Sequence, residues 1–276
     1  MAFSLNGLEG KVAVVTGAGR RRGLGRAIAL ALAQSGCDVA VTGSGRDPAS
    51  FPDDEKAVGW RDAESVADEL RALGRRALAA VCDVASLASV EALAARVRAE
   101  LGGVDFVVNN AAAIPRARER LPVVEADPER WARIVDVNLK GTFHVCHVFG
   151  RVLVEQGRGG AIVNVSSIAG KRMAPNNSAY GSSKAAVHAL TAAMSGEVAA
   201  HGVRVNALCT GIFDTASNDE IPKGETWDAM VRAQIPLGRA GRPEELAAMA
   251  VYLCSDQGAW ITGQLYSVDG GNLPGR

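Results

Sequence analysis

Short β-branched runs alternate with helical patterns along nearly the whole chain, and this alternation constrains the fold more than any other feature. Strands are expected at residues 12–15, 39–42, 78–82, 106–108, 161–165, 203–208 and 264–268. Helical periodicity is expected at residues 25–34, 62–73, 90–101, 128–155, 179–200 and 243–254. Helices that alternate with strands cross over a parallel sheet. We therefore expect an α/β fold, a doubly wound parallel sheet with helices on both faces, in one domain spanning residues 1–276.

Composition and charge exclude several classes of protein. The 276 residues carry a formal net charge of zero, so no global charge favours nucleic acid or an anionic membrane. No stretch is long and apolar enough to span a bilayer or to act as a secretory signal. The cysteines form no C-x-x-C pair, which is typical of a reducing compartment, and we expect a cytoplasmic protein. The histidines show no metal-ligand pattern, so no metal is expected.

A glycine-rich stretch, TGAGRRRGLG at residues 16–25, follows the first strand and opens the first helix. Backbone N–H groups and the helix dipole favour an anion there, and glycine lets a pyrophosphate approach closely. The common G-x-G-x-x-G spacing is absent, because Arg22 stands where the third glycine would be. Either the loop has a two-residue insertion after Gly17, or Gly19 takes the place of the first glycine.

Further motifs follow in a fixed order. They are Asn109-Asn-Ala-Ala112, Asn138, Ser166-Ser167, Tyr180-Gly-Ser-Ser-Lys184, Pro236-Leu-Gly-Arg239 and Val268-Asp-Gly-Gly271. In this order and spacing the chain resembles the short-chain dehydrogenase/reductase family, and is similar to its 3-oxoacyl-carrier-protein reductase-like members. The resemblance covers residues from about Leu8 to Gly271. It implies a single Rossmann-fold domain and an NAD(P)-dependent oxidoreductase that interconverts alcohols and carbonyl compounds.

A catalytic group can be argued from four side chains. Tyr180 and Lys184 are four residues apart on a predicted helix and share a face. A lysine ammonium one turn away favours the phenolate, so the tyrosine can exchange a proton with a substrate oxygen, and Lys184 can also hold the nicotinamide ribose. Ser167 follows a strand and can hydrogen-bond the same oxygen. The resemblance gives Asn138 the role of anchoring a water in a proton relay to Lys184.

The resemblance also assigns coenzyme contacts. Asp83 and Val84 would meet the adenine, Asn110 and Ala111 the adenosine-side ribose region, and Ile212 and Thr215 the nicotinamide amide and the phosphates. The other expected contacts are Gly17, Gly19, Arg22, Gly23, Leu24 and Gly25 in the glycine loop, Ser44 and Arg46 after the second strand, and Tyr180 and Lys184.

The choice of coenzyme follows from charge at the end of the second strand. Relatives that prefer NAD usually present a carboxylate there, which bonds the ribose hydroxyls and repels a 2′-phosphate. This chain has Gly43 and Ser44 at that position, with Arg46 just beyond and Arg22 in the glycine loop. Arginines suit a phosphomonoester, so NADP(H) is favoured. NAD(H) stays possible, because an aspartate of the long loop predicted at residues 43–59 (Asp47, Asp53 or Asp54) could fold onto the ribose.

Two functional classes remain open. One is a carbonyl reductase or alcohol dehydrogenase for a small-molecule substrate; the other is a non-catalytic dinucleotide-binding regulator. The presence of all four catalytic candidates favours the enzyme. Binding of nucleic acid through the short arginine run 20–22 is disfavoured, and no membrane partner is expected. Residues 214–235 are polar and acidic, which is typical of a mobile lid over a substrate.

The family resemblance also implies assembly. Relatives pair the helices corresponding to residues 128–155 and 179–200, so a homotetramer or homodimer is expected. The second helix carries alanines that permit close helix approach, at Ala185, Ala186, Ala189, Ala192 and Ala193. The alternative is that these alanines pack only against the protein's own sheet.

Overall fold

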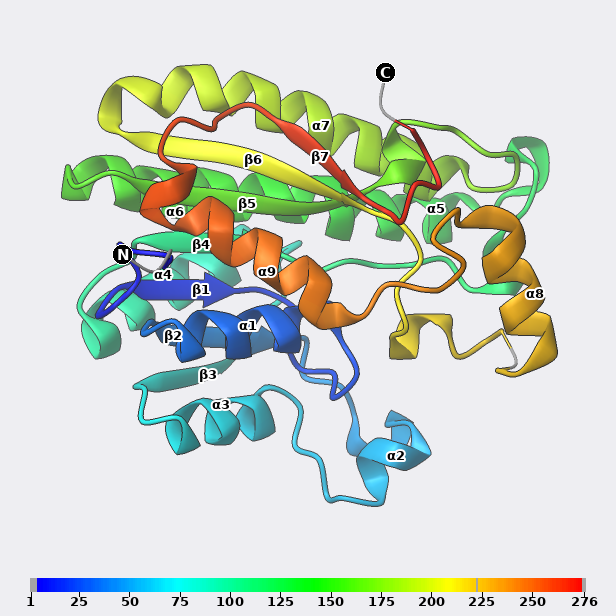
Figure 1. The fold of residues 1–276 in the computed structure, drawn as a ribbon, viewed down its shortest axis with the longest axis horizontal. Coiled ribbons are helices and arrows are strands. Elements are labelled where there is room, and N and C mark those ends of the chain that lie inside the picture. Colours follow the sequence, from blue (N-terminus) through cyan, green and yellow to red (C-terminus); the bar gives the residue numbers. More distant parts are fainter. Residues whose placement is uncertain (1–3, 222, 275–276) are drawn as a thin grey trace.

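The computed structural model describes residues 4–221 and 223–274, and its centre is a parallel sheet of seven strands (Figure 1). The strand order is β3-β2-β1-β4-β5-β6-β7, which reverses direction between β1 and β4. Ligands of such sheets bind at the carboxyl ends of the strands, near the point of reversal. The strands are β1 (Val12–Val15), β2 (Asp38–Gly43), β3 (Ala77–Val81), β4 (Phe106–Asn109), β5 (Gly160–Ser167), β6 (Val203–Thr210) and β7 (Leu265–Val268).

Helices cover both faces of the sheet, as predicted. The first face carries α1 (Leu24–Gln34), α3 (Ala63–Ala72) and α9 (Pro243–Cys254). The second carries α4 (Leu87–Leu101), α6 (Gly141–Gln156) and α7 (Ser178–Val198). Within the described residues, no helix is long and apolar enough to cross a membrane.

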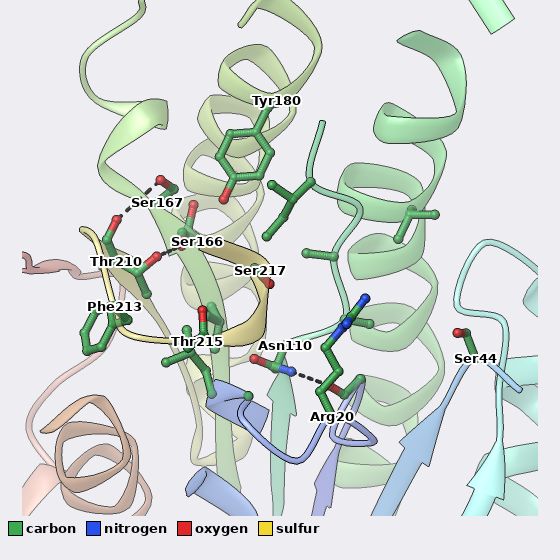
Figure 2. Close-up of a pocket in the computed structure, with 18 of the residues that line it drawn as sticks. Arg20, Ser44, Asn110, Ser166, Ser167, Tyr180, Thr210, Phe213, Thr215 and Ser217 are labelled. Carbon is green, nitrogen blue, oxygen red and sulfur yellow. Dashed lines mark hydrogen bonds between the residues drawn. The ribbon is translucent and has the colours of Figure 1, made fainter. Parts of the chain in front are cut away.

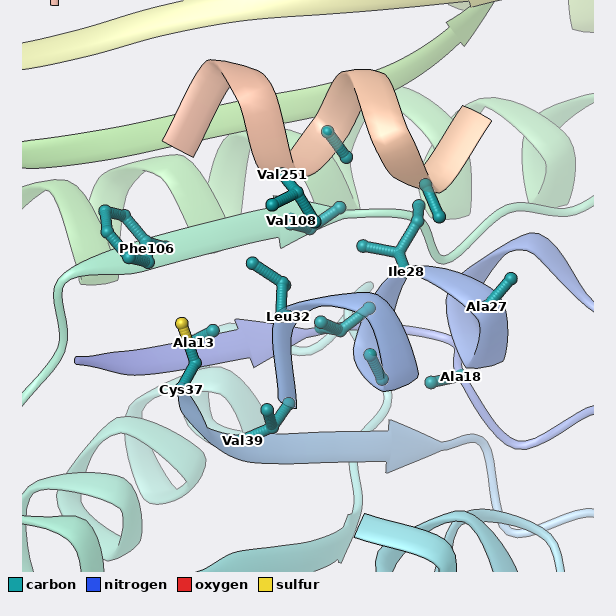
Figure 3. Close-up of a cluster of buried hydrophobic side chains, with 14 of the residues drawn as sticks. Ala13, Ala18, Ala27, Ile28, Leu32, Cys37, Val39, Phe106, Val108 and Val251 are labelled. Carbon is teal, nitrogen blue, oxygen red and sulfur yellow. The ribbon is translucent and has the colours of Figure 1, made fainter. Parts of the chain in front are cut away.

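Small and β-branched side chains fill the space between helices and sheet. On the first face, Leu32 of α1 and Val251 of α9 pack with Val39 and Val108 of the strands (Figure 3). Leu32, Val39 and Val108 are fully buried, and Val251 is nearly so. Burying such a side chain contributes about 1.5–3 kcal/mol, which is why these short apolar runs predict the strands well.

The strands β5 and β6 are longer than predicted. Their parallel ladder continues to the pair Ser167 and Thr210, each the last residue of its strand. Ser167 was expected to lie just beyond a strand, whereas it ends one. Rigid pairing therefore fixes its backbone at the carboxyl edge of the sheet.

The long helix expected at residues 128–155 is interrupted. It consists of α5 (Pro128–Val135), a π-helical turn (Asp136–Lys140) and α6. Asp127 caps α5 by accepting hydrogen bonds from the N–H groups of Glu129 and Arg130. A π-helical turn inserts one extra residue into a helix and is often found at functional sites. Asn138 lies at the centre of this turn.

Two segments expected to be irregular contain short helices. Residues 43–59 include a turn of 3₁₀-helix (Pro48–Ser50) and the single helical turn α2 (Asp53–Lys56). Residues 214–235 include α8 (Glu225–Gln234), whose Trp227 and Val231 are buried against Ile235. The second segment is therefore anchored by its own small apolar cluster.

Candidate active site

One elongated pocket runs along the carboxyl ends of the strands and has a volume of about 420 Å³. At one end lie the glycine loop and the end of β2; at the other lie Tyr180, Ser167 and Lys184. Figure 2 shows Tyr180 pointing into this pocket on the side where Ser166 and Ser167 lie. The pocket thus brings the predicted coenzyme loop and the predicted catalytic side chains into one cavity.

Lys184 is fixed beneath the pocket. It is only 3% exposed, and its ammonium donates a 3.0 Å hydrogen bond to the carbonyl of Val165. Its Nζ atom lies 5.7 Å from the centroid of the Tyr180 ring. Burial lowers the pKa of Lys184 to about 8, because the charged form loses hydration.

Burial dominates the acidity of Tyr180. It raises the pKa of the phenol above its ordinary value, and the Ser167 hydroxyl and the charge of Arg120 only partly oppose this. We expected Lys184 to favour the phenolate, but in the structure the neutral phenol is favoured. A neutral phenol is the form that can donate a proton to a carbonyl oxygen.

Ser167 is held by the backbone around it. Its Oγ accepts a hydrogen bond from the N–H of Ala169 at 3.1 Å and donates one to the carbonyl of Thr210 at 3.3 Å. The second bond is long and the pocket lies beside it, so the hydroxyl can turn to a substrate oxygen at small cost.

Asn138 does not line the pocket; it is fully buried behind it. Its Oδ1 accepts a 2.7 Å hydrogen bond from the N–H of Ala113, and its Nδ2 donates to the carbonyl of Ala113 at 3.0 Å. Nδ2 also lies 3.2 Å from Oγ of Ser183, next to Lys184 in sequence. The side chain therefore joins the π-helical turn to the segment after β4 and to α7.

The glycine loop makes the tight turn after β1 at Gly17. Its φ is +65°, and a Cβ there would lie 2.6 Å from Cα of Ala111. The N–H of Gly17 also bonds Oγ1 of Thr42 at 3.2 Å. Gly17 therefore holds the first glycine position, which favours the two-residue insertion over replacement by Gly19.

The start of α1 suits an anion. Gly23 occupies the N-cap, no side chain caps the helix and its first turn has no acidic residue. Gly23 and Leu24 both line the pocket, so the free N–H groups of the first turn lie at its edge. This arrangement fits the pyrophosphate of a dinucleotide.

The two arginines on which the NADP prediction rests are already paired. Arg22 bonds the carboxylates of Asp54 and Asp219 and does not line the pocket. Arg46 lines the pocket but bonds Glu55 at 2.9 Å and Asp62 at 2.8 Å. Both predicted phosphate ligands are thus engaged by carboxylates, and of the two only Arg46 lies at the pocket.

Most other predicted contacts lie where expected. The pocket is lined by Gly17, Gly19, Gly23, Leu24, Ser44, Asp83, Val84, Asn110, Ala111, Ile212 and Thr215. Gly25 lies behind the lining, where a Cβ would come within 2.5 Å of Nδ2 of Asn110.

Sequence reasoning missed several lining residues. They are Arg20, Asp62, Ala112, Ile114, Arg120, Ser166, Asn177, Thr210, Phe213, Ser217 and Asn218. Asn177 lines the pocket, while its Oδ1 is buried and has no hydrogen-bond partner among the described residues. Ala112 and Ser166 belong to motifs quoted above, and Ser217 and Asn218 to the segment 214–235, but none of these four was expected to line the pocket. No motif marks Asp62, and only the fold brings it to the pocket.

Comparison with known proteins decides the family. A family model described as enoyl-(acyl carrier protein) reductase matches residues 17–272. The sorbitol dehydrogenase of Cereibacter sphaeroides is 34% identical, with 96% of this chain and 98% of that protein covered. The chain belongs to the short-chain dehydrogenase/reductase family. It is accordingly an oxidoreductase of the kind that acts on alcohols and carbonyl compounds, as the resemblance implied.

Other members of the family are equally similar along their whole length. A 3-oxoacyl-[acyl-carrier-protein] reductase of Thermotoga maritima is 33% identical, with 96% of this chain and 98% of that protein covered. A solved structure of 7α-hydroxysteroid dehydrogenase, in complex with NADH and 7-oxo glycochenodeoxycholic acid, is 30% identical. It superposes with a TM-score of 0.82 and covers 96% of this chain and 94% of its own. The Rossmann fold of this dehydrogenase/reductase is thereby confirmed.

Proposed function

We propose that this protein, as a single catalytic domain, transfers a hydride between a nicotinamide dinucleotide and a small secondary alcohol or ketone. The observation that carries the proposal is the single pocket. It joins the uncapped start of α1 to Tyr180, Ser167 and Lys184. A bound coenzyme would supply the hydride chemistry, and the protein would orient it and handle the proton.

Each member of the group has a separate role in the proposal. Tyr180 donates or accepts the proton at its phenol oxygen, because it is the titratable side chain that faces the pocket beside Ser167. Ser167 hydrogen-bonds the same substrate oxygen. Lys184 holds the nicotinamide ribose and places a positive charge below the phenol. Asn138 positions the segment around Ala113 and, through its π-helical turn, anchors the water that would relay protons to Lys184.

The substrate class follows from the relatives and the pocket. Their names include a sugar-alcohol dehydrogenase, an oxoacyl reductase and a steroid dehydrogenase, so the family accommodates hydroxyl and carbonyl groups on varied skeletons. In this chain Asn177 and Arg120 line the pocket, and the charge of Arg120 acts on Tyr180. These polar side chains favour a polar small molecule over a purely apolar one.

The coenzyme proposal differs from the one the sequence favours. NADP(H) depends on Ser44, Arg46 and Arg22, and the two arginines are engaged by carboxylates. Of the predicted phosphate ligands, Ser44 and Arg46 line the pocket, and Arg46 is paired with Glu55 and Asp62. This supports the alternative, NAD(H), for which a family member in complex with NADH is a precedent.

Two further proposals concern assembly and location. On α7, Ala189, Ala192 and Ala193 are exposed, so they do not pack against the protein's own sheet. Phe143 of α6 is 47% exposed and lines a groove between α6 and α7, together with Leu190 and Met194 of α7. Exposed small and aromatic residues on adjacent helices support a homodimer or homotetramer.

The five cysteines are free and buried, which supports the cytoplasm as the location.

Turnover of a panel of ketones and secondary alcohols, with NAD(H) and NADP(H), tests the function. The decisive variant is Tyr180→Phe, which removes only the phenol oxygen. We expect it to lower turnover by about 10²–10⁴-fold and to leave coenzyme affinity nearly unchanged. If Tyr180→Phe turns over substrate within a few-fold of wild type, Tyr180 is not the residue that transfers the proton. Coenzyme binding with no turnover of any substrate would favour the non-catalytic regulator instead.

A further inference from the structure

A carboxylate that no motif predicts lies at the adenosine end of the pocket. Asp62 lies 18 residues beyond Ser44 in the sequence, yet its side chain covers Gly43, the last residue of β2. A Cβ on Gly43 would overlap with Oδ2 of Asp62, and a Cβ on Gly19 would overlap with Oδ1. The carboxylate is therefore in contact with both the end of β2 and the glycine loop.

Asp62 is held there by one guanidinium. Oδ1 accepts hydrogen bonds from Nε of Arg46 at 3.1 Å and from Nη2 at 2.8 Å. The other side of Arg46 bonds Glu55 at 2.9 Å, and its guanidinium lies 4.4 Å from the centroid of the Phe51 ring. Two carboxylates thus share one cation, and Oδ2 of Asp62 has no hydrogen-bond partner in the part of the chain that the structure describes.

The segment that carries Asp62 is fastened to the glycine loop. Nε1 of Trp60 donates a 2.7 Å hydrogen bond to the carbonyl of Gly19, and Oε1 of Glu55 accepts one from the N–H of Arg21 at 2.9 Å. The two extra residues of the glycine loop are therefore bound by residues of the segment 44–62. Loop and segment form one wall of the pocket.

The backbone of Asp62 is strained. Its φ is +53° with ψ of −131°, a conformation that favours glycine. Strain of this kind persists only when the surroundings enforce it, and it is often found at ligand sites. Here it turns the carboxylate toward Gly43 and Gly19.

We propose that Asp62 makes this enzyme selective for NAD(H). Oδ2 accepts a hydrogen bond from the 2′-hydroxyl of the adenosine ribose, which lies next to the end of the second strand in folds of this type. A 2′-phosphate would meet the same carboxylate, and Arg46 is already committed to Asp62 and Glu55. Arg20 also lines the pocket, close enough to Asp62 and Glu55 for their negative charges to act on its guanidinium. The inference rests on the proposed function, since it needs a dinucleotide in the pocket.

Direct binding tests the inference without any substrate. NADH and NADPH are titrated into the wild-type protein, Asp62→Asn and Asp53→Asn, and their fluorescence gives each dissociation constant. Asp53→Asn is the matched control, because Asp53 is an exposed aspartate of the same segment. One charge-assisted hydrogen bond corresponds to about a tenfold to hundredfold change in affinity. We expect the wild type and Asp53→Asn to bind NADH at least about tenfold more tightly than NADPH, and Asp62→Asn to reduce that ratio by about tenfold or more.

A second variant separates recognition from structure. Asp62→Gly removes the carboxylate and suits the positive φ, so it should remain folded, with a melting temperature close to wild type. It should lose NADH selectivity as Asp62→Asn does. Equal or tighter binding of NADPH by the wild type would overturn the inference, and so would equal weakening of both coenzymes in the variants. Binding of neither coenzyme by the wild type would instead refute the proposed function, and the inference with it.

Discussion

The ammonium of Lys184 donates to the carbonyl of Val165 and lies 5.7 Å from the centroid of the Tyr180 ring. Val165 belongs to β5 and Tyr180 to α7, so the lysine links the sheet to the helix directly below the pocket. Its charge is only marginally retained there, because burial lowers its pKa to about 8. This has a consequence for coenzyme binding.

Affinity for NADH should fall as the pH rises through 8. Lys184 is protonated below its pKa and neutral above it, so the donor to the nicotinamide ribose weakens on the alkaline side. We expect about a tenfold loss of affinity between pH 7 and pH 9, measured by fluorescence titration. Lys184→Met should bind weakly at both values. A wild-type affinity that does not change over this range would contradict the role.

Removing the carboxylate of Glu55 should destabilise the protein. Glu55 is 1% exposed and pairs with Arg46. Arg46 keeps its second carboxylate, Asp62, but Glu55→Leu leaves the N–H of Arg21 and one side of the guanidinium without an acceptor, so it should lower the free energy of unfolding by about 1–3 kcal/mol. Asp54→Asn is the control, because Asp54 pairs with Arg21 and Arg22 at the surface and should cost less than about 1 kcal/mol. The free energies of unfolding are measured with urea. Equal decreases for Glu55→Leu and Asp54→Asn would show that the pair of Glu55 with Arg46 is dispensable.

Acid should destabilise the fold partly through His188. Its Nε2 lies 2.8 Å from Oγ of Ser166 and 3.2 Å from Sγ of Cys209, and burial lowers its pKa to about 4. An unfolded histidine has a pKa of about 6.5, so the unfolded state binds more protons between these values and stability falls as the pH drops through them.

The comparison of His188→Gln with wild type isolates this contribution. Between pH 7 and pH 4.5 the wild type should lose on the order of 2 kcal/mol more than the variant, measured by urea unfolding. If the free energy of unfolding falls by the same amount in both proteins, groups other than His188 cause the acid sensitivity.

A charge on the exposed face of α7 should prevent assembly. Ala192→Glu places a carboxylate where close helix approach is proposed, and Ala88→Glu on α4 is the control at another exposed alanine. Light scattering should give a multiple of 28.6 kDa for the wild type and the control, and a smaller assembly for Ala192→Glu. A wild-type mass of one chain at micromolar concentration would refute the oligomer.

The order of strands and helices, and the meeting of Tyr180 and Lys184 at one pocket, could be predicted because local pattern carries them. Short β-branched runs such as residues 12–15 are stable only when they are buried as strands of the sheet. Tyr180 and Lys184 are one helical turn apart, so they share a face of α7. Asp62 could not be predicted, since its position depends on a strained φ and on an ion pair with Arg46. Arg22 was misjudged for the same reason: one of its partners, Asp219, is 197 residues away.

The π-helical turn at residues 136–140 makes chain length a determinant of the catalytic group. An α-helix rotates by about 100° per residue, so one residue fewer would turn α6 by that angle relative to α5. Asn138 would then face away from Ala113 even though no side chain had been exchanged. Alignments that treat single-residue deletions here as neutral would therefore misjudge which homologous sequences keep the hydrogen bonds between Asn138 and Ala113, and the count of residues between Asp127 and Gly141 is the criterion to apply.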